Sequence, residues 1–326
     1  MPVIVYRLQP WPFVDRLVFD LCPDAFELVP MARDASAEER ARVFLQADAE
    51  FLMGSWVTTA VKLTEADFQA APKLKLLQLM SAGYEHIDLD LAARYGVPVA
   101  HFGDAMASVV AEHTLLLILA VLRRITVLDG AVRSGAWRTG EPVLHELRGK
   151  RVGLVGLGFI GRAVARRLGG FECEVTYFSR HKLSSADEQA LGIRYVDLDL
   201  LLGSSDVVSL HVPLAPSTLR LIGPRELGLM QPHAVLINTS RGAVVDQPAL
   251  RAALQTGALA GAGLDVLDPE PPVAADPLLQ LPNVVFTPHN AGQAEEVWPR
   301  IVRTCLANID HVSHGEPPRF LARKLE

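Results

Sequence analysis

The chain has 326 residues, of which 50% are hydrophobic and 21% are charged, and its formal net charge is −6. At roughly 100–200 residues per domain this length predicts about two domains, and such an apolar composition excludes a disordered chain. A mildly acidic chain is a poor binder of nucleic acid or of anionic membranes, so we expect neither as a partner. Cys22, Cys173 and Cys305 are too few and too scattered for a disulfide framework or a metal cluster, and no metal is expected.

The N-terminal sequence MPVIVYRLQPW lacks the basic region and the long apolar region of a signal peptide. The longest apolar run, residues 114–122, is too short to span a bilayer. We therefore expect a cytoplasmic protein.

Short β-rich runs alternate with helical patterns over the first hundred residues. The helical pattern after Ser36 opens with a capping box, because Glu39 follows three residues later. Apolar strands that alternate with helices predict a parallel sheet covered on both faces. The predicted strands are residues 3–8, 26–31, 49–56, 74–83 and 97–102, and the predicted helices are 12–22, the one from Ser36, 64–71 and 88–96.

A single long helix is predicted from about Ala107 to Ser134. Its first half is apolar nearly all round, so this helix must be buried. Both a core position and a contact with a second subunit satisfy that requirement, and the two remain open at this point.

A second series of strands and helices begins at Arg151. Six strands are predicted in it, the number in a dinucleotide-binding sheet, and a Pro-rich loop covers residues 267–277. The six strands are RVGLV, EVTYFS, DVVSLHV, AVLINT, GAGLDV and NVVFT.

A G-x-G-x-x-G motif, Gly156-Leu157-Gly158-Phe159-Ile160-Gly161, joins the first of these strands to a helix at Phe159–Leu168. The first glycine permits the tight turn, the second lets the backbone approach a pyrophosphate, and the third lets helix and strand pack closely. The helix N-terminus offers N–H groups and a positive dipole end to the phosphates. We therefore expect a bound dinucleotide at this loop.

The acid that normally binds the ribose 2′-hydroxyl about twenty residues later is absent. Ser179 stands in its place, followed by Arg180 and Lys182. A hydroxyl and two cations suit a 2′-phosphate, which a carboxylate would repel. The sequence therefore predicts NADP in preference to NAD.

Three polar residues, Arg241, Glu270 and His289, follow the ends of the later strands, where ligands of such sheets bind. Reduction of a 2-keto acid needs a cation for the carboxylate and a proton donor for the carbonyl oxygen. Histidine is the acid whose pKa lies nearest working pH, and a neighbouring carboxylate favours its charged form. We expect these three to be catalytic. Five other histidines are interpreted as structural or solvated: His86, His101, His113, His145 and His311.

Several segments resemble, in order, the signature segments of the D-isomer-specific 2-hydroxyacid dehydrogenases. The earlier ones are SAGYEHID and VVAEHTLLLILAVLR, and the later ones are LRGKRVGLVGLGFIG, HVPLAPST, LINTSRGAVVD, GAGLDVLDPEP and NVVFTPH. The resemblance implies two doubly wound parallel-sheet α/β domains with the active site between them. These are a flavodoxin-like substrate domain, residues 1–101 plus 291–326, and a Rossmann cofactor domain, residues 102–290. It also implies a homodimer built around the helix that starts near Val110.

The resemblance also implies roles for individual residues. Arg241 would bind the substrate carboxylate, His289 would be the general acid for reduction, and Glu270 would hydrogen-bond His289. Backbone N–H groups of Ala82 and Gly83 would bind the substrate carboxylate. Asp265 would contact the nicotinamide end of the cofactor, and the cofactor groove would be lined by Val212, Pro213 and Thr239.

Some positions depart from the family pattern. Gly103 is displaced by one position and Met106 replaces the usual Asn, which predicts a different loop near the cofactor and not a different fold. Glu270 stands where the formate-oxidising branch usually has Gln, which argues against formate. The substrate pocket is expected to include residues 53–56, with Trp298 and Arg300 as further candidates.

The sequence thus predicts an NADP(H)-dependent oxidoreductase of small 2-keto acids, similar to glyoxylate and hydroxypyruvate reductases. One alternative is a relative that acts on another anion, such as phosphite, or on a bulkier 2-hydroxy acid. An alternative of another class is a dinucleotide-sensing interaction protein similar to the corepressors of the family.

Overall fold

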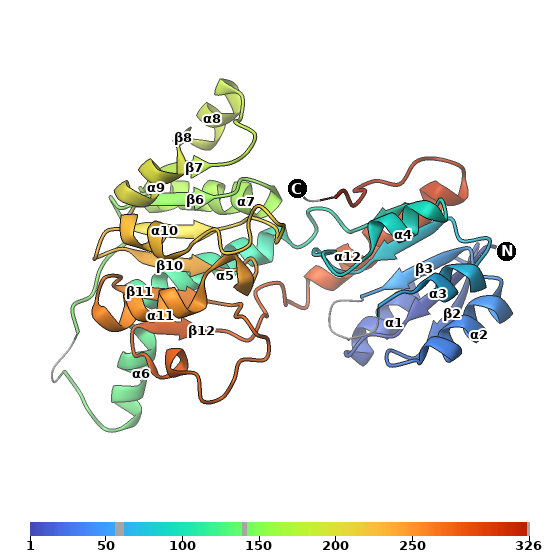
Figure 1. Ribbon diagram of the computed structural model, residues 1–326, viewed down its shortest axis with the longest axis horizontal. Helices are drawn as coiled ribbons and strands as arrows, with labels where there is room; N and C mark the ends of the chain where they lie inside the picture. The colour runs from blue at the N-terminus through green and yellow to red at the C-terminus, as the bar shows by residue number, and fades with distance from the viewer. Residues whose placement is uncertain (56–61, 139–141, 325–326) are drawn as a thin grey trace. The chain divides into compact units, whose positions relative to one another are not determined.

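The computed structural model describes residues 1–55, 62–138 and 142–324 (Figure 1). The chain divides into two compact units. Unit 1 comprises residues 1–106 together with the C-terminal segment from Ala294, and unit 2 comprises residues 107–293. Within the described residues, no helix is long and apolar enough to cross a membrane.

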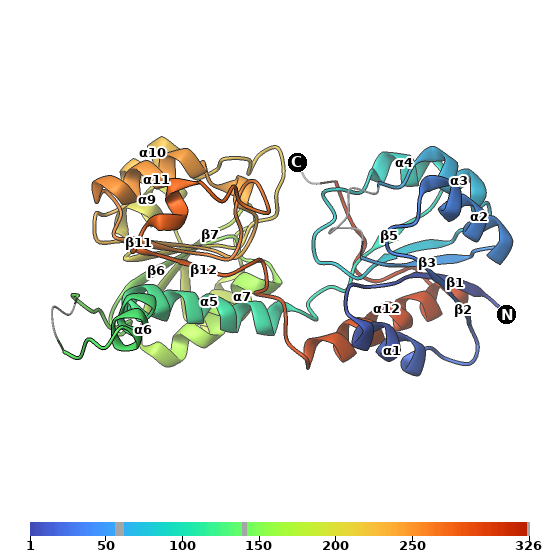
Figure 2. The same ribbon diagram turned by 90° about the horizontal axis from the view of Figure 1, so that it is seen from below.

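Unit 1 contains, in its described part, a parallel sheet of five strands in the order β2-β1-β3-β4-β5. This is the flavodoxin-like strand order, in which the chain reverses direction across the sheet at β1. Figure 2 shows α1 and α12 on one face of this sheet and α2, α3 and α4 on the other. The strands are β1 (Val3–Arg7), β2 (Glu27–Met31), β3 (Phe51–Gly54), β4 (Leu76–Leu79) and β5 (Val99–Ala100). The helices are α1 (Pro12–Leu21), α2 (Ala37–Ala47), α3 (Glu65–Ala70), α4 (Leu89–Arg94) and α12 (Val297–Ser313).

The central strands β1, β3 and β4 are buried along their whole length. Parallel strands covered on both faces carry continuous apolar runs, as these do. The expected capping box of α2 is present: Ser36 Oγ accepts from Glu39 N–H, and Ser36 N–H donates to Glu39 Oε2.

The C-terminal segment completes unit 1. Asn308 of α12 donates from Nδ2 to Oε1 of the buried Gln78 in β4 at 2.8 Å. Further on, Leu321 forms an antiparallel bridge with Ala100 at the end of β5. Residues from both ends of the sequence therefore form one core.

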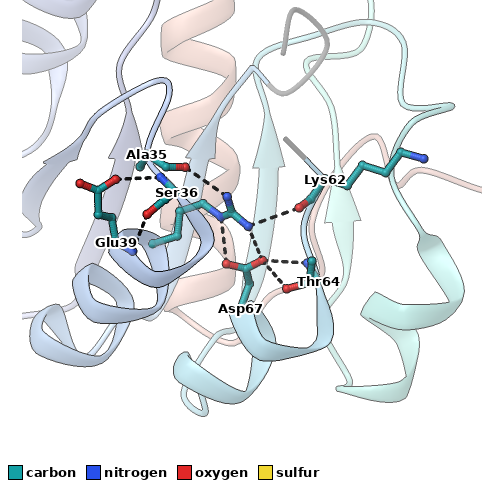
Figure 3. Close-up of polar contacts among 7 residues, drawn as sticks. Ala35, Ser36, Glu39, Lys62, Thr64 and Asp67 are labelled. Atoms are coloured by element: carbon teal, nitrogen blue, oxygen red, sulfur yellow. Dashed lines mark hydrogen bonds and ion pairs between the residues drawn. The ribbon is translucent and has the colours of Figure 1, made fainter. Parts of the chain in front are cut away.

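A buried ion pair ties α2 to α3. Arg40 donates from Nε and Nη2 to the two carboxylate oxygens of Asp67 at 2.9 and 2.8 Å, and both side chains are at most 4% exposed. Figure 3 shows the further hydrogen bonds of these two side chains. Asp67 also accepts from Thr64, and the Arg40 guanidinium donates to the carbonyl oxygens of Ala35 and Lys62. The charges are thus compensated within a site that excludes water.

Unit 2 contains, among its described residues, a parallel sheet of seven strands in the order β12-β11-β10-β9-β6-β7-β8. From β8 to β11 this is the Rossmann order, extended by β12. The predicted count of six strands is wrong, because β8 (Ile193–Tyr195) was not recognised. It has only three residues, too few to show a periodic pattern. The other strands are β6 (Arg151–Val155), β7 (Glu174–Phe178), β9 (Val207–Leu210), β10 (Val235–Asn238), β11 (Gly261–Leu264) and β12 (Val284–Phe286).

Two apolar layers enclose this sheet. Figure 2 shows α5, α6 and α7 on one face and α9, α10 and α11 on the other. Each layer has its own cluster of buried side chains, centred on residues such as Ile118 and Val164 in one and Leu201 and Leu250 in the other. The helices of unit 2 are α5 (Ala107–Leu122), α6 (Ile125–Arg133), α7 (Phe159–Leu168), α8 (Ser185–Leu191), α9 (Leu198–Ser204), α10 (Pro224–Leu229) and α11 (Gln247–Thr256).

The single helix predicted over 107–134 is wrong: it is two helices, α5 and α6. The break lies at Arg124, whose backbone is left-handed with φ of 50°. The carbonyl of Leu122, released at the end of α5, accepts the backbone N–H of His145 at 3.0 Å. The break thus accompanies a contact with a distant segment, and no Gly or Pro between Leu122 and Ile125 indicates it in the sequence.

Candidate active site

The glycine-rich loop lies between β6 and α7, as predicted. A Cβ on Gly156, where φ is +95°, would lie 2.6 Å from the carbonyl oxygen of His211, and one on Gly161 would lie 2.4 Å from the carbonyl oxygen of Gly156. A Cβ on Gly158 would meet no atom within 4 Å. The first and third glycines are thus required by packing, whereas the second leaves open space beside the helix N-terminus, as a dinucleotide pyrophosphate needs.

The residues expected to bind a 2′-phosphate follow β7 at its carboxyl end. Arg180 and Lys182 are exposed and Ser179 is half-buried. Lys182 Nζ lies 5.5 Å from the ring centroid of Tyr195 in β8, a cation–π geometry. Tyr177 accepts the Leu183 N–H at 2.8 Å and donates to Glu188 at 2.9 Å. Tyr177 and Tyr195 thus both contact residues of this basic segment.

Glu270 and His289 are in direct contact. His289 Nδ1 lies 2.6 Å from Glu270 Oε2, and Glu270 Oε1 accepts the Leu267 N–H at 2.9 Å. Both side chains are partly exposed, 43% for His289 and 36% for Glu270. Arg241 follows β10, where its carbonyl oxygen accepts from the amide of Asn238. Glu270 and His289 are 19 positions apart in the sequence, and the structure brings their side chains into contact.

The pKa of Glu270 is lower than its ordinary value. Burial alone would raise this pKa, but the hydrogen bonds from His289 and Leu267 and the charges of His289 and Arg241 outweigh it. Arg241 is thus one of the charges that act on this carboxylate. The imidazole of His289 and the carboxylate of Glu270 therefore form one hydrogen-bonded pair.

Asp265 follows β11 and is 2% exposed. Its Oδ1 accepts from Thr287 Oγ1 at 2.5 Å and from Asn290 N–H at 3.0 Å, and its Oδ2 accepts from Ala291 N–H at 3.0 Å. Its carbonyl oxygen accepts the His289 N–H at 2.7 Å. Asp265 is thus the anchor of the segment that carries His289, a role that the sequence did not predict.

The residues expected to line the cofactor groove lie after the neighbouring strands of the same sheet. Val212 and Pro213 follow β9, and Thr239 follows β10. Thr239 Oγ1 lies 3.1 Å from Thr114 Oγ1 of α5. Helix α5 therefore contacts the segment after β10 in which Thr239 lies.

His113 was interpreted as structural or solvated, yet it contacts the candidate site. Its Nε2 lies 2.9 Å from Thr287 Oγ1 and 3.7 Å from Asp265 Oδ1. Nothing in the sequence near His113 indicates this, because its partners lie more than 150 residues away. Within the described ranges, no group of three or more His, Cys, Asp or Glu side chains could hold a metal ion.

The substrate residues expected in unit 1 lie at the end of β3 or after β3 and β4. Ser81 Oγ donates to the carbonyl oxygen of Gly83 at 2.9 Å, while Ala82 is exposed. Met53 is buried within β3, and Trp56 lies outside the described residues.

Trp298 and Arg300, the further pocket candidates, both belong to α12. Trp298 is 4% exposed, and its ring centroid lies 5.1 Å from that of Trp11. Arg300 donates to the carbonyl oxygen of Ala105 at 3.3 Å. Both side chains therefore have partners within unit 1.

A Rossmann sheet with a glycine-rich loop between β6 and α7 is typical of a dinucleotide-binding domain. A family model described as D-isomer specific 2-hydroxyacid dehydrogenase, NAD binding domain, matches residues 115–291. A glyoxylate reductase from Thermococcus litoralis is 41% identical over 270 residues, 81% of each chain.

Two solved structures extend the likeness over nearly the whole chain. The apo form of D-mandelate dehydrogenase from Rhodotorula graminis has a TM-score of 0.87 at 29% identity, covering 100% of this chain and 98% of that one. An NADPH-dependent glyoxylate/hydroxypyruvate reductase from Sinorhizobium meliloti, in complex with citrate, has a TM-score of 0.85 at 30% identity, covering 99% and 98%.

The chain belongs to the D-isomer-specific 2-hydroxyacid dehydrogenase family. It is an NAD(P)-dependent enzyme of small 2-hydroxy or 2-keto acids, as the sequence predicted. The predicted fold class, two doubly wound parallel-sheet α/β domains, is also confirmed.

Proposed function

We propose that the enzyme reduces small 2-keto acids of the glyoxylate and hydroxypyruvate type with NADP(H). The observation that carries the proposal is the 2.6 Å contact between His289 Nδ1 and Glu270 Oε2. The names of the relatives support it, since one is a glyoxylate reductase and another an NADPH-dependent glyoxylate/hydroxypyruvate reductase.

Each of the three side chains has a distinct task in this reaction. The Arg241 guanidinium binds the substrate carboxylate, assisted by the backbone N–H groups of Ala82 and Gly83. Because Glu270 occupies Nδ1 of His289, the proton for the carbonyl oxygen comes from Nε2. The nicotinamide, when bound, supplies the hydride. Glu270 stays ionised throughout, which its lowered pKa favours.

A preference for NADP is supported by the segment after β7. Ser179, Arg180 and Lys182 stand where NAD enzymes carry an acid, and a doubly charged phosphate gains from a hydroxyl and two cations. Ser179→Asp should reverse the preference, because its carboxylate repels the phosphate and accepts from a ribose hydroxyl. Steady-state kinetics of both proteins with NADPH and NADH test this, and a wild-type preference for NADH would refute it.

The substrate class is tested with a panel of keto acids, using nicotinamide absorbance as the readout. We expect glyoxylate and hydroxypyruvate to give the highest kcat/KM, and His289→Ala to lose turnover while still binding NADPH. Higher kcat/KM for phenylglyoxylate, or oxidation of phosphite, would favour the relatives that act on bulkier or other anions. Tight NADPH binding without any turnover would instead favour a dinucleotide-sensing interaction protein.

The proposed assembly is a homodimer formed through α5 and α6. Their exposed apolar side chains support it: Leu116, Ile125 and Val132 are 56%, 50% and 53% exposed. Leu116→Lys should shift the protein to a monomer in light-scattering chromatography. Leu45→Lys, at a 68% exposed position of α2, is the matched control and should leave the assembly unchanged.

A further inference from the structure

A chain of two hydrogen bonds joins α5 to the carboxylate of Asp265. Thr287 Oγ1 donates to Asp265 Oδ1 at 2.5 Å, and His113 Nε2 lies 2.9 Å from the same hydroxyl oxygen. A threonine hydroxyl has a single proton, which here is given to the carboxylate. His113 must therefore donate, so its ring carries a proton on Nε2.

The segment at the end of this chain carries the proposed general acid. Asp265 accepts the N–H groups of Asn290 and Ala291 on its two carboxylate oxygens, and that of His289 on its carbonyl oxygen. His289 itself is in the left-handed region, with φ of 51°. A histidine adopts this conformation rarely, so it depends on the bonds that surround it.

Burial and the charge of Asp265 act on the protonation state of His113, and hence on its ability to donate a hydrogen bond to Thr287. Burial lowers the pKa of His113, and the nearby charge of Asp265 opposes this only in part. At neutral pH the ring is therefore uncharged and holds one proton. Because the Thr287 hydroxyl accepts a hydrogen bond from Nε2, this proton is on Nε2. Asp265 is the charged group that faces the ring, with its Oδ1 at 3.7 Å from Nε2.

We propose that His113 is a positioning residue of the reaction. By donating to Thr287, His113 fixes the hydrogen bond from the Thr287 hydroxyl to the Asp265 carboxylate. The conformation of residues 287–291 depends on this bond, and so does the direction of the His289 side chain. The inference rests on the proposed function, since it takes His289 as the general acid. The adjacent Thr114 contacts Thr239, so one turn of α5 supports both the catalytic segment and the cofactor groove.

The first test uses the protein without cofactor or substrate. His113→Leu removes the donor, whereas His113→Gln places an amide N–H near the position of Nε2. In His113→Leu, hydrogen exchange at Asn290 and Ala291 should speed up about tenfold, with β11 amides unchanged. His113→Gln should keep the wild-type rates. A change spread equally over β11 would indicate only loosened packing and would overturn the proposal.

The second test is kinetic. His113→Leu should lower kcat for glyoxylate about tenfold with little change in the Kd for NADPH, and His113→Gln should restore most of it. His233→Leu is the matched control, because it breaks another His–Asp contact of unit 2, 2.8 Å from His233 Nε2 to Asp206 Oδ1. Its kcat should equal that of wild type.

Thr287→Val and Thr287→Ser provide a second pair if His113→Leu does not fold. Valine removes the hydroxyl and serine retains it, so only the first should show faster exchange and lower kcat. Unchanged exchange in every variant would refute the role of His113. If wild type reduces no keto acid, the proposed function fails instead, and the exchange rates still decide the inference.

Discussion

His289 and Glu270 share a hydrogen bond of 2.6 Å although 19 residues separate them. Glu270 holds its position through a second bond, from the Leu267 N–H to Oε1. The imidazole is therefore oriented by a carboxylate that is itself held in place. In acid–histidine pairs of this kind, the hydrogen bond to one ring nitrogen leaves the other nitrogen for catalysis.

We expect Glu270→Gln to lower kcat for glyoxylate by about 10- to 100-fold, because an amide neither carries charge nor fixes the ring as firmly. Glu316→Gln is the matched control, since Glu316 Oε2 lies 3.0 Å from His311 Nδ1 in unit 1. The control should retain wild-type kcat. Equal activity of Glu270→Gln and wild type would remove Glu270 from the mechanism.

The buried pair of Arg40 and Asp67 predicts a large and non-additive effect on stability. Arg40→Met leaves an uncompensated buried carboxylate and should reduce the free energy of unfolding by about 3–5 kcal/mol. Adding Asp67→Leu should recover part of that loss, because the stranded charge is gone. Urea unfolding of the wild type, both single variants and the double variant measures this, and simple additivity would contradict it.

Asp206 predicts a pH dependence of stability. Burial alone would raise the pKa of this carboxyl, but the Arg151 N–H, His233 and the charges of Arg151 and Lys150 bring it below the ordinary 3.8. A lowered pKa means that the ionised form stabilises the folded state above pH 3.8, and that this contribution is lost as pH falls through the folded pKa.

Wild type should therefore exceed Asp206→Asn in unfolding free energy at pH 7, and the difference should shrink below about pH 4. Urea titrations between pH 7 and pH 3 would show this. A difference that stays constant over this range would contradict the assignment.

Tyr195 is predicted to affect the choice of cofactor through Lys182. Tyr195→Leu removes the ring beneath the ammonium group, a contact worth about 0.5–1 kcal/mol at an exposed site. The KM for NADPH should rise roughly two- to fivefold, while that for NADH stays unchanged. Tyr195→Phe retains the ring and should behave as wild type, and an equal rise for both cofactors would count against a role in phosphate binding.

The sequence was sufficient where a short segment determines its own structure. The capping box at Ser36 and the glycine-rich loop before Phe159 are examples, since their hydrogen bonds and close approaches are set by nearby residues. Arg241, Glu270 and His289 follow later strands of one parallel sheet, and their order along the sequence was enough to predict that they lie at the same edge of it.

What could not be predicted depends on contacts between distant segments. The helix break at Arg124 accompanies the hydrogen bond from His145 to Leu122, and His113 reaches Thr287 across 174 positions. The strand Ile193–Tyr195 is too short to have a pattern of its own and exists by pairing with β7. Such features require the fold before they can be recognised.

The return of the C-terminal segment to unit 1 sets an order of events during synthesis. Residues 107–293 are continuous in the sequence, so all of this unit is translated before the chain reaches Ala294. The sheet begun by β1, although translated first, lacks the Asn308 partner of Gln78 and the Leu321 bridge until those late residues emerge. Synthesis of unit 1 therefore starts before that of unit 2 and is completed after it.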